Sequence, residues 1–145
     1  MNNPISLFKE WFSEASESSC PEPGAMTLST VSAEGIPSSR VVLLKDSGED
    51  GFVFYTNLGS RKNLEIEKNP NVALGFYWPE ISRQVRITGK AIAVTPEEAD
   101  AYFESRPRQS QLGAWASKQS TIIENKLDLE KRLASVAARF RLSAV

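Results

Sequence analysis

Two basic residues follow a turn in the sequence GFVFYTNLGSRKNLEI, which spans residues 51–66. The aromatic and β-branched residues at its start predict a buried strand, and the Asn-Leu-Gly-Ser sequence after them predicts a turn. Ser60 is a good N-cap for a helix that stops before Pro70. Arg61 and Lys62 would lie in the first turn of that helix, where the positive end of the helix dipole favours anions. The segment therefore indicates either a site for an anion, most simply a phosphate monoester, or a solvated basic pair after a turn.

A second group of polar and basic residues follows another predicted helix. Residues 95–98, Thr-Pro-Glu-Glu, provide an N-cap, a proline at N1 and a capping-box glutamate for a helix that ends before Pro107. Tyr102 and Arg106 are four residues apart, so both project from one side of its final turn. The group continues with Arg108, Ser110 and Gln111. Taken alone, it is best explained as the ordinary basic C-terminal end of a helix, which the dipole stabilises.

The sequence contains no histidine and a single cysteine, Cys20. A Ser-His-Asp triad, a Cys-His pair and an ordinary zinc site are therefore excluded for these residues, and no metal is expected. Cys20 has no base near it in sequence and is interpreted as a bystander. If the chain is an enzyme, a bound organic cofactor must carry the difficult chemistry while the protein supplies orientation and charge.

Length and composition predict one domain over residues 1–145. The hydrophobic content of 41% is sufficient for a single compact core. A net charge of −1, from 17 basic and 18 acidic residues, gives no general attraction to nucleic acid or anionic membranes. The sequence shows no secretion signal and no apolar run approaching the roughly 18 residues of a membrane span. With no possible internal disulfide, a cytoplasmic location is expected.

Hydrophobic periodicity predicts a mainly β fold with flanking helices, of the α+β class. The predicted strands are residues 25–31, 38–45, 52–55, 72–78 and 83–94, the first three forming an antiparallel meander with a turn at 46–51. The predicted helices are residues 5–16, 60–68, 95–105 and 122–140, with a short helix or turn at 112–117 that anchors Trp115 in the core. Strands of this number and length favour a closed or nearly closed barrel.

Six sequence blocks occur along the chain in a fixed order. They are RVVLLK (40–45), FYTN (54–57), SRK (60–62), RQV (83–85), YFESRPR (102–108) and SQLGAWASKQS (110–120). In these blocks, and over about residues 7–140, the chain resembles the pyridoxamine 5′-phosphate oxidase family. The resemblance implies an FMN-binding split β-barrel and a homodimer with two FMN sites at the subunit interface. It also implies a role in vitamin B6 metabolism: oxidation of pyridoxamine 5′-phosphate or pyridoxine 5′-phosphate to pyridoxal 5′-phosphate, with electrons passing through FMN to oxygen.

The resemblance implies a role for each residue that matches the family pattern. Those that hold FMN are Arg40, Val41, Val42, Leu43, Leu44, Lys45, Tyr55, Thr56, Arg61 and Lys62, the last two at its phosphate. Those that complete the flavin pocket from the partner subunit are Gln84, Gln119 and Ser120. Those that bind the substrate phosphate are Lys45, Tyr102, Arg106 and Ser110. The implied chemistry is hydride transfer from substrate C4′ to flavin N5, and no residue is assigned as a catalytic acid or base.

The sequence departs from the family pattern at its C-terminal end. Family members continue with further strands that carry a tryptophan beside the flavin, another FMN-binding arginine and an Arg-x-His pair over the substrate ring. None of these has a counterpart here, and part of the family's dimerisation segment is absent as well. We therefore expect FMN and substrate binding, with slow turnover by these residues alone.

Two alternatives to the oxidase remain open. One is a non-catalytic relative that binds FMN or a B6 vitamer, and the other is a flavin reductase that acts on another small molecule. Retention of Tyr102, Arg106 and Ser110 favours the oxidase over the reductase, because a substrate without phosphate would not need this set.

Overall fold

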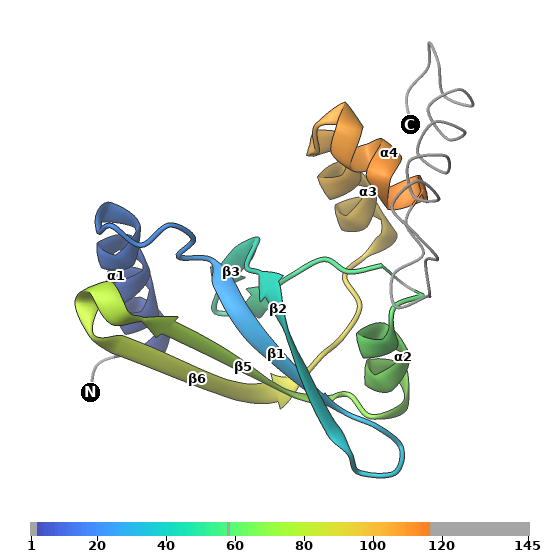
Figure 1. The fold of residues 1–145 in the computed structure, drawn as a ribbon, viewed down its shortest axis with the longest axis horizontal. Helices are drawn as coiled ribbons and strands as arrows, with labels where there is room; N and C mark the ends of the chain where they lie inside the picture. Colours follow the sequence, from blue (N-terminus) through green and yellow to red (C-terminus); the bar gives the residue numbers. More distant parts are fainter. Residues whose placement is uncertain (1–2, 58, 117–145) are drawn as a thin grey trace, which may run out of the picture. The chain divides into compact units, whose positions relative to one another are not determined.

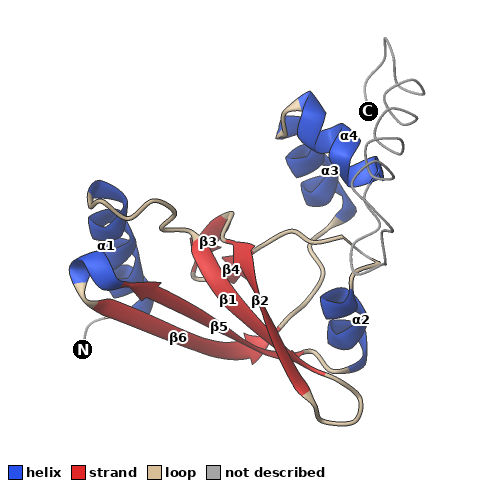
Figure 2. Cartoon of the chain, viewed as in Figure 1, coloured by secondary structure: helices blue, strands red, loops and turns tan. Residues whose placement is uncertain are grey.

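In the computed structural model, the described residues are 3–57 and 59–116, and they form four α-helices, one short 3-10 helix and six strands (Figures 1 and 2). The strands are β1 (Ala25–Val31), β2 (Pro37–Leu43), β3 (Asp46–Gly48), β4 (Gly51–Val53), β5 (Asn71–Trp78) and β6 (Arg83–Lys90). The helices are α1 (Pro4–Glu17), α2 (Arg61–Lys68), the 3-10 helix η1 (Pro79–Ile81), α3 (Pro96–Ser105) and α4 (Arg108–Ala116).

The described residues divide into two compact units. The first contains the chain up to Tyr55 together with Glu65–Ala91, and the second contains Thr56–Leu64 together with the chain from Ile92 onward. The first unit therefore holds α1 and all six strands, and the second holds α3 and α4. Within residues 3–57 and 59–116, no helix combines the length and the apolar character that crossing a membrane requires.

Four strands of the first unit form an antiparallel sheet in the order β2-β1-β5-β6 (Figure 2). β1 and β2 pair along their whole length as a hairpin. In its turn the Gly35 N–H donates to the Ser32 carbonyl at 2.9 Å. Gly35 has a φ of +83°, a conformation that glycine adopts without steric cost. The predicted hairpin is confirmed, with its second strand at Pro37–Leu43 instead of 38–45.

The predicted meander does not continue past β2. The other neighbour of β1 is β5, while β3 and β4 pair only with each other. Residues 46–51, predicted as a turn, contain β3, and the strand predicted at 52–55 ends at Val53. The Asp-Ser-Gly sequence of β3 has a low strand propensity, so its pairing depends on the tight turn before Gly51, where φ is +129°.

β6 ends at Lys90, four residues before the predicted end at 94. Its partner β5 begins at Asn71, and the preceding Pro70 has no N–H to donate. The Pro70 carbonyl still accepts from the Ala91 N–H at 2.8 Å, and the pairing stops there. Among the described strands, β2 and β6 remain edges of the sheet, so the closed barrel suggested by strand count is not present in this part of the chain.

The core lies between α1 and one face of the four-stranded sheet (Figure 1). Its buried apolar side chains are Phe8, Ala15, Met26, Leu28, Val42, Leu74, Phe76 and Trp78. The Phe8 ring is central, with its centroid 4.9 Å from that of Phe52 and 5.2 Å from that of Phe76. Each such aromatic pair contributes about 0.5–1.5 kcal/mol beyond the area it buries. The Trp78 indole N–H is satisfied by the Pro23 carbonyl at 2.9 Å.

Local capping signals place α1 and α3 as predicted. The Asn3 side chain caps α1 by accepting from the Ile5 N–H at 2.8 Å, so the helix predicted at 5–16 is confirmed as Pro4–Glu17. The Thr95 hydroxyl caps α3 by accepting from the Glu98 N–H at 3.2 Å.

α4 begins at Arg108, four residues before the short helix predicted at 112–117. The reason is that the Pro107 carbonyl accepts the Gln111 N–H at 3.1 Å and so starts a new helix directly after α3. The side chain of Trp115 and the helix predicted at 122–140 lie outside the described residues.

Truncating the core should destabilise the protein far more than truncating an exposed residue of similar size. Leu28→Ala is expected to cost about 2–5 kcal/mol, because Leu28 is 0% exposed and its removal leaves a cavity under α1. Ile36→Ala, at a hairpin residue that is 59% exposed, should cost about 1 kcal/mol or less. Urea unfolding followed by tryptophan fluorescence measures both, and equal losses would contradict the assignment of the buried face.

Candidate functional site

The first turn of α2 is built around the buried hydroxyl of Ser60. The Ser60 Oγ accepts from the Asn63 N–H at 3.4 Å, and the Ser60 carbonyl accepts from the Leu64 N–H at 3.1 Å. Ser60 is therefore the N-cap, as predicted, and its side chain is 0% exposed. The Thr56 Oγ1 lies 3.2 Å from the Ser60 Oγ. The hydroxyls of Thr56 and Ser60 thus fix the start of the helix in the second unit.

The turn before α2 is held by one asparagine. The Asn57 Oδ1 accepts from the Gly59 N–H at 2.9 Å, and the Asn57 carbonyl accepts from the Ser60 N–H at 3.0 Å. These two hydrogen bonds connect the turn directly to the first turn of α2.

Two cations stand on this first turn. The Lys62 side chain is buried, with only 8% of the residue exposed, whereas Arg61 is exposed. Lysine is rarely this buried, because its charge loses hydration unless anionic or dipolar groups replace it. The backbone N–H groups of Arg61 and Lys62 precede the first i→i−4 hydrogen bond of α2, at the positive end of its dipole. This donor set fits a phosphate monoester such as that of FMN.

The structure brings the second basic group together at the junction of α3 and α4. The Arg106 guanidinium carbon lies 5.8 Å from the centroid of the Tyr102 ring, so the two side chains share one side of α3, as predicted. Ser110 is half-buried in the first turn of α4. Arg108 and Ser110 thus open a new helix and are not the basic C-terminal end of α3. The Gln111 side chain ends α3, because its Nε2 donates to the Phe103 carbonyl at 2.8 Å.

Residues 40–43 belong to β2 of the first unit and alternate between its two faces, and residues 44 and 45 lie just beyond the strand. Val42 lies in the core, whereas Val41 and Leu43 are 66% and 41% exposed on the opposite face. Arg40 shares the core side with Val42. Lys45 is exposed just beyond the strand, where its backbone N–H donates to the Val53 carbonyl at 2.8 Å. Leu44 and Tyr55, the other assigned residues of this unit's N-terminal half, are half-buried.

Arg40 belongs to a polar network that the sequence analysis missed. Its Nη1 donates to the Thr30 Oγ1 at 2.7 Å, and its Nη2 donates to the Ser38 Oγ at 2.8 Å. The Glu65 carboxylate accepts from both hydroxyls and lies 3.8 Å from the Arg40 Nη2. The available signal is Thr30 itself, a polar residue at a position that β-strand alternation assigns to the core after Met26 and Leu28.

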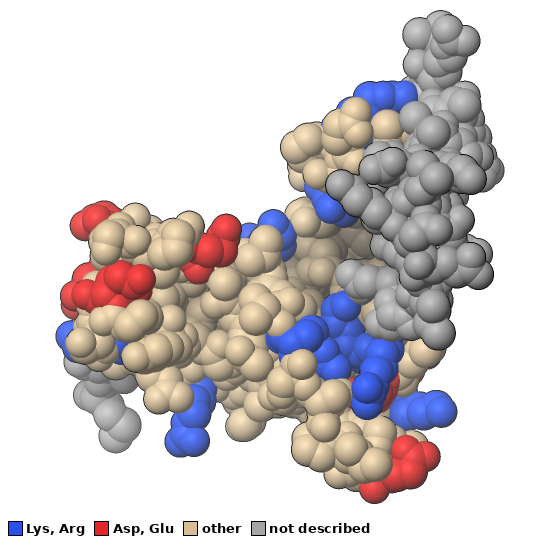
Figure 3. Space-filling model, in the orientation of Figure 1, with Lys and Arg blue, Asp and Glu red and all other residues tan. Residues whose placement is uncertain are grey.

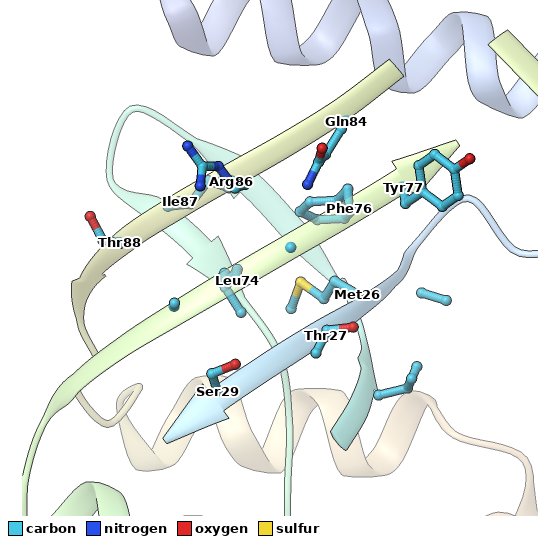
Figure 4. Close-up of a pocket in the computed structure, with 14 residues that line it drawn as sticks. Met26, Thr27, Ser29, Leu74, Phe76, Tyr77, Gln84, Arg86, Ile87 and Thr88 are labelled. Atoms are coloured by element: carbon cyan, nitrogen blue, oxygen red, sulfur yellow. The ribbon is translucent and has the colours of Figure 1, made fainter. Parts of the chain in front are cut away.

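The sheet face opposite α1 forms an open groove of about 890 Å³ (Figure 4). Tyr77 of β5 is 71% exposed on this face. Gln84 and Arg86 of β6 stand on the same face (Figure 4), and Arg86 pairs with the small residue Gly75 of β5. β6 alternates between its two faces, since Gln84, Arg86 and Thr88 are exposed while Val85 and Ile87 are half-buried. Gln119 and Ser120, which were grouped with Gln84, lie outside the described residues.

Charge is unevenly distributed over the first unit. Its acidic side chains gather over α1 (Figure 3), where Glu10, Glu14 and Glu17 lie. Of the basic residues, Arg83 stacks on α1 with its guanidinium carbon 5.0 Å from the centroid of the Trp11 ring. Arg40 is instead bound within the polar network, where its side chain is 23% exposed. An anion therefore meets unfavourable charge at α1 and a partly accessible cation at β2.

Comparison with known proteins assigns the chain to one family. The family model described as pyridoxamine 5′-phosphate oxidase matches residues 12–139. A relative from Rubrobacter xylanophilus, named pyridoxine/pyridoxamine 5′-phosphate oxidase, is 56% identical over 138 residues, which cover 95% of this chain and 64% of the relative. A relative of the same name from Haemophilus influenzae is 52% identical over 97% of this chain and 67% of its own length. The chain thus spans about two thirds of the length of these curated relatives.

Two solved structures resemble the fold. PhzG from Burkholderia lata 383, in complex with tetrahydrophenazine-1-carboxylic acid, has a TM-score of 0.88 and 28% identity, and the match covers 96% of this chain and 69% of PhzG. A pyridoxamine 5′-phosphate oxidase-related, FMN binding protein from Nostoc punctiforme has a TM-score of 0.70, with 90% of this chain and 72% of that protein covered. At 18% identity the second likeness concerns the fold alone.

The antiparallel sheet with its flanking helices is consistent with the split-barrel, α+β class expected from the sequence. The family match extends over most of the chain, and the curated relatives share about half of its residues. The chain therefore belongs to the pyridoxamine 5′-phosphate oxidase family.

Proposed function

We propose that this chain binds FMN and a phosphorylated B6 vitamer, as part of an oxidase that converts pyridoxamine 5′-phosphate or pyridoxine 5′-phosphate to pyridoxal 5′-phosphate with oxygen as electron acceptor. The observation that supports the proposal is the first turn of α2, where Ser60 and Lys62 are both buried at the helix N-terminus, a setting that suits a phosphate. The names of the relatives from Rubrobacter xylanophilus and Haemophilus influenzae support the choice of substrate.

The residues that we assign to FMN fall into two sets. In the second unit we assign Thr56, Arg61 and Lys62, whose hydroxyl and cations suit its phosphate. In the first unit we assign Tyr55 and the β2 segment Arg40, Val41, Val42, Leu43, Leu44 and Lys45. When bound, FMN would supply the redox chemistry, which is acceptance of a hydride from the C4′ carbon of the substrate and transfer of its electrons to oxygen. The protein contributes binding, orientation and charge.

The substrate phosphate is assigned to Lys45, Tyr102, Arg106 and Ser110. Arginine provides a planar pair of donors, lysine a point charge, and the two hydroxyls bind the remaining phosphate oxygens. The Tyr102 ring beside the Arg106 guanidinium restricts the orientations that this arginine adopts before substrate arrives. An arginine that is oriented in advance loses less conformational entropy when the phosphate binds.

A second copy of the chain is proposed to cover the open sheet face. Tyr77 and Val41 expose 71% and 66% of their surface there, beside Gln84. Exposed apolar side chains grouped with polar ones are typical of protein interfaces. Gln84, with Gln119 and Ser120, would then complete the flavin site of the partner subunit. We further propose that the protein is cytoplasmic, since its single cysteine suits a reducing compartment.

Two other functions are supported by particular observations. A non-catalytic FMN- or vitamer-binding protein is favoured by the lack of histidine in these 145 residues. A flavin enzyme for another small molecule is favoured by the likeness to PhzG, whose structure contains tetrahydrophenazine-1-carboxylic acid. The pairing of Tyr102 with Arg106 favours a phosphorylated substrate over this last possibility.

Binding of FMN should depend on its phosphate. Riboflavin is expected to bind far more weakly, and Lys62→Met should weaken FMN about ten- to a hundredfold, since a charged hydrogen bond contributes about 1.5–3 kcal/mol. Lys68→Met, in the last turn of the same helix, is the matched control and should change neither affinity. Flavin fluorescence titration measures both ligands. Equal affinity of the wild-type chain for FMN and riboflavin would contradict the phosphate site.

The protein should be a homodimer when saturated with FMN. Tyr77→Glu is expected to shift it toward monomer and to weaken FMN binding, because a charge on the open sheet face opposes burial of that face. Glu14→Lys, on the exposed surface of α1, should leave the dimer intact. Multi-angle light scattering at several protein concentrations is the measurement, and a monomer at saturating FMN would eliminate the shared site.

Substrate binding and turnover should separate in this chain. Pyridoxal 5′-phosphate is expected to bind and to weaken about tenfold or more in Arg106→Met, since the phosphate contacts supply much of the affinity. Oxygen-dependent oxidation of pyridoxamine 5′-phosphate should be about a hundredfold slower or more than in the full-length Haemophilus influenzae relative, because the ring-positioning Arg-x-His pair is missing here.

The same assay distinguishes the alternatives. Full activity of the 145-residue chain would show that the ring-positioning pair is dispensable. A chimera in which the remaining C-terminal part of the Haemophilus influenzae relative follows Val145 should recover activity, and an inactive but folded, FMN-loaded chimera would favour the non-catalytic binding protein.

A further inference from the structure

The hydrogen bonds around Arg40 form a closed ring with a fixed direction. An arginine side chain has only donors, so the hydroxyls of Thr30 and Ser38 must accept from it at 2.7 Å and 2.8 Å. Each hydroxyl has a single hydrogen, which it gives to the Glu65 carboxylate, Ser38 at 2.9 Å. Both hydroxyls therefore have a fixed orientation, because each donates to Glu65 and accepts from one terminal nitrogen of the Arg40 guanidinium.

Glu65 is the terminal acceptor of this ring. Its Oε2 accepts from both Thr30 and Ser38 and lies 3.8 Å from the Arg40 Nη2. The residue is only 7% exposed, and Thr30 is 0% exposed, so these bonds form where water does not compete with them. Removing the carboxylate leaves two hydroxyls without the acceptor that fixes their rotation. The guanidinium keeps its hydrogen bond from Nη1 to the Leu28 carbonyl at 3.2 Å, but the two hydroxyl oxygens that also orient it are no longer held in place.

The accessible part of the ring is Arg40, whose side chain is 23% exposed while that of Glu65 is 9% exposed. Phosphate is the ionised group of FMN at neutral pH, and a guanidinium recognises phosphate only when its planar donors face the oxygens. The alternative is that the Glu65 carboxylate has a purely structural role and does no more than hold the β1-β2 hairpin to α2. The two roles differ because the structural one makes no distinction between FMN and riboflavin.

We propose that Glu65 is a positioning residue for flavin nucleotide binding: through Thr30 and Ser38 it holds the Arg40 guanidinium in the orientation that binds the phosphate of FMN. The inference rests on the proposed function, which assigns Arg40 to FMN without naming the group it binds, and it adds that this group is the phosphate. It adds a residue of α2 that touches neither flavin nor substrate. The charges of Glu65 and Arg40 compensate each other, so the ring presents oriented N–H donors without a net negative charge that would repel a phosphate.

The test compares two substitutions of Glu65 in the full 145-residue chain. In Glu65→Gln an amide oxygen can replace Oε2 and keep the ring, so FMN affinity should stay within about threefold of wild type. In Glu65→Leu the acceptor is lost, and FMN affinity should fall about tenfold or more while riboflavin affinity changes less than about twofold, as expected for one disordered charged contact. Glu67→Leu, at an exposed position of the same helix, is the matched control and should change neither.

Ser38→Ala and a double mutant complete the experiment. Ser38 is only half-buried, so its substitution opens one side of the ring in a protein that folds, and it should lower FMN affinity without affecting riboflavin. If Glu65→Leu does not fold, the result with Ser38→Ala decides whether the proposal stands. Arg40→Met combined with Ser38→Ala should bind FMN no more weakly than Arg40→Met alone, because Ser38 acts only through Arg40.

Three results would overturn the proposal. They are unchanged FMN affinity in Ser38→Ala and Glu65→Leu, parallel weakening of FMN and riboflavin, and full additivity with Arg40→Met. Failure of the proposed function looks different, because the wild-type chain would then show no preference for FMN over riboflavin. That result removes the phosphate site itself, and the role of Glu65 with it.

Discussion

The packing of Phe8 against the four-stranded sheet is the constraint on which the rest of the first unit depends. Its ring contacts those of Phe52 and Phe76, so one side chain of α1 joins the helix to both sheets. Because α1 covers a single face, the alternation of each strand divides its side chains between a filled core and an open groove. The side of the sheet on which a residue falls therefore determines whether it serves stability or is available for binding.

Arg40 shows how this division is used at its margin. It extends from β2 on the core side, opposite the buried Leu28 of β1, and its guanidinium reaches Thr30, which pairs with Ser38 beyond the apolar core. A cation at such a position is stable only with hydrogen-bonded anionic partners, and the carboxylate that α2 contributes meets that need. The polar network thus extends the packed interior beyond the apolar core, with hydrogen bonds in place of apolar contacts.

Local sequence signals were sufficient to predict the helices and strands, but they did not predict which distant segments pair. Ser60, Thr95 and the turn at Gly35 were predicted because their caps and turn act within four residues. β1 pairs with β5, and Thr30 bonds to Glu65 across 35 residues. No short stretch of sequence contains a signal for either contact. Glu65 was passed over because a glutamate within a helix is normally solvated. The ligand roles came from the resemblance to the family, since the basic clusters alone also fitted solvated surfaces.

The direction of the hydroxyl bonds also limits how this protein can vary in evolution. Positions 30 and 38 each need a side chain that accepts from a guanidinium and donates to a carboxylate at once, a combination that serine and threonine share. Exchange between serine and threonine should therefore be tolerated, whereas alanine or valine breaks the relay and aspartate brings a second negative charge. Two small polar residues on a hairpin thus carry a constraint that comes from the proposed ligand site.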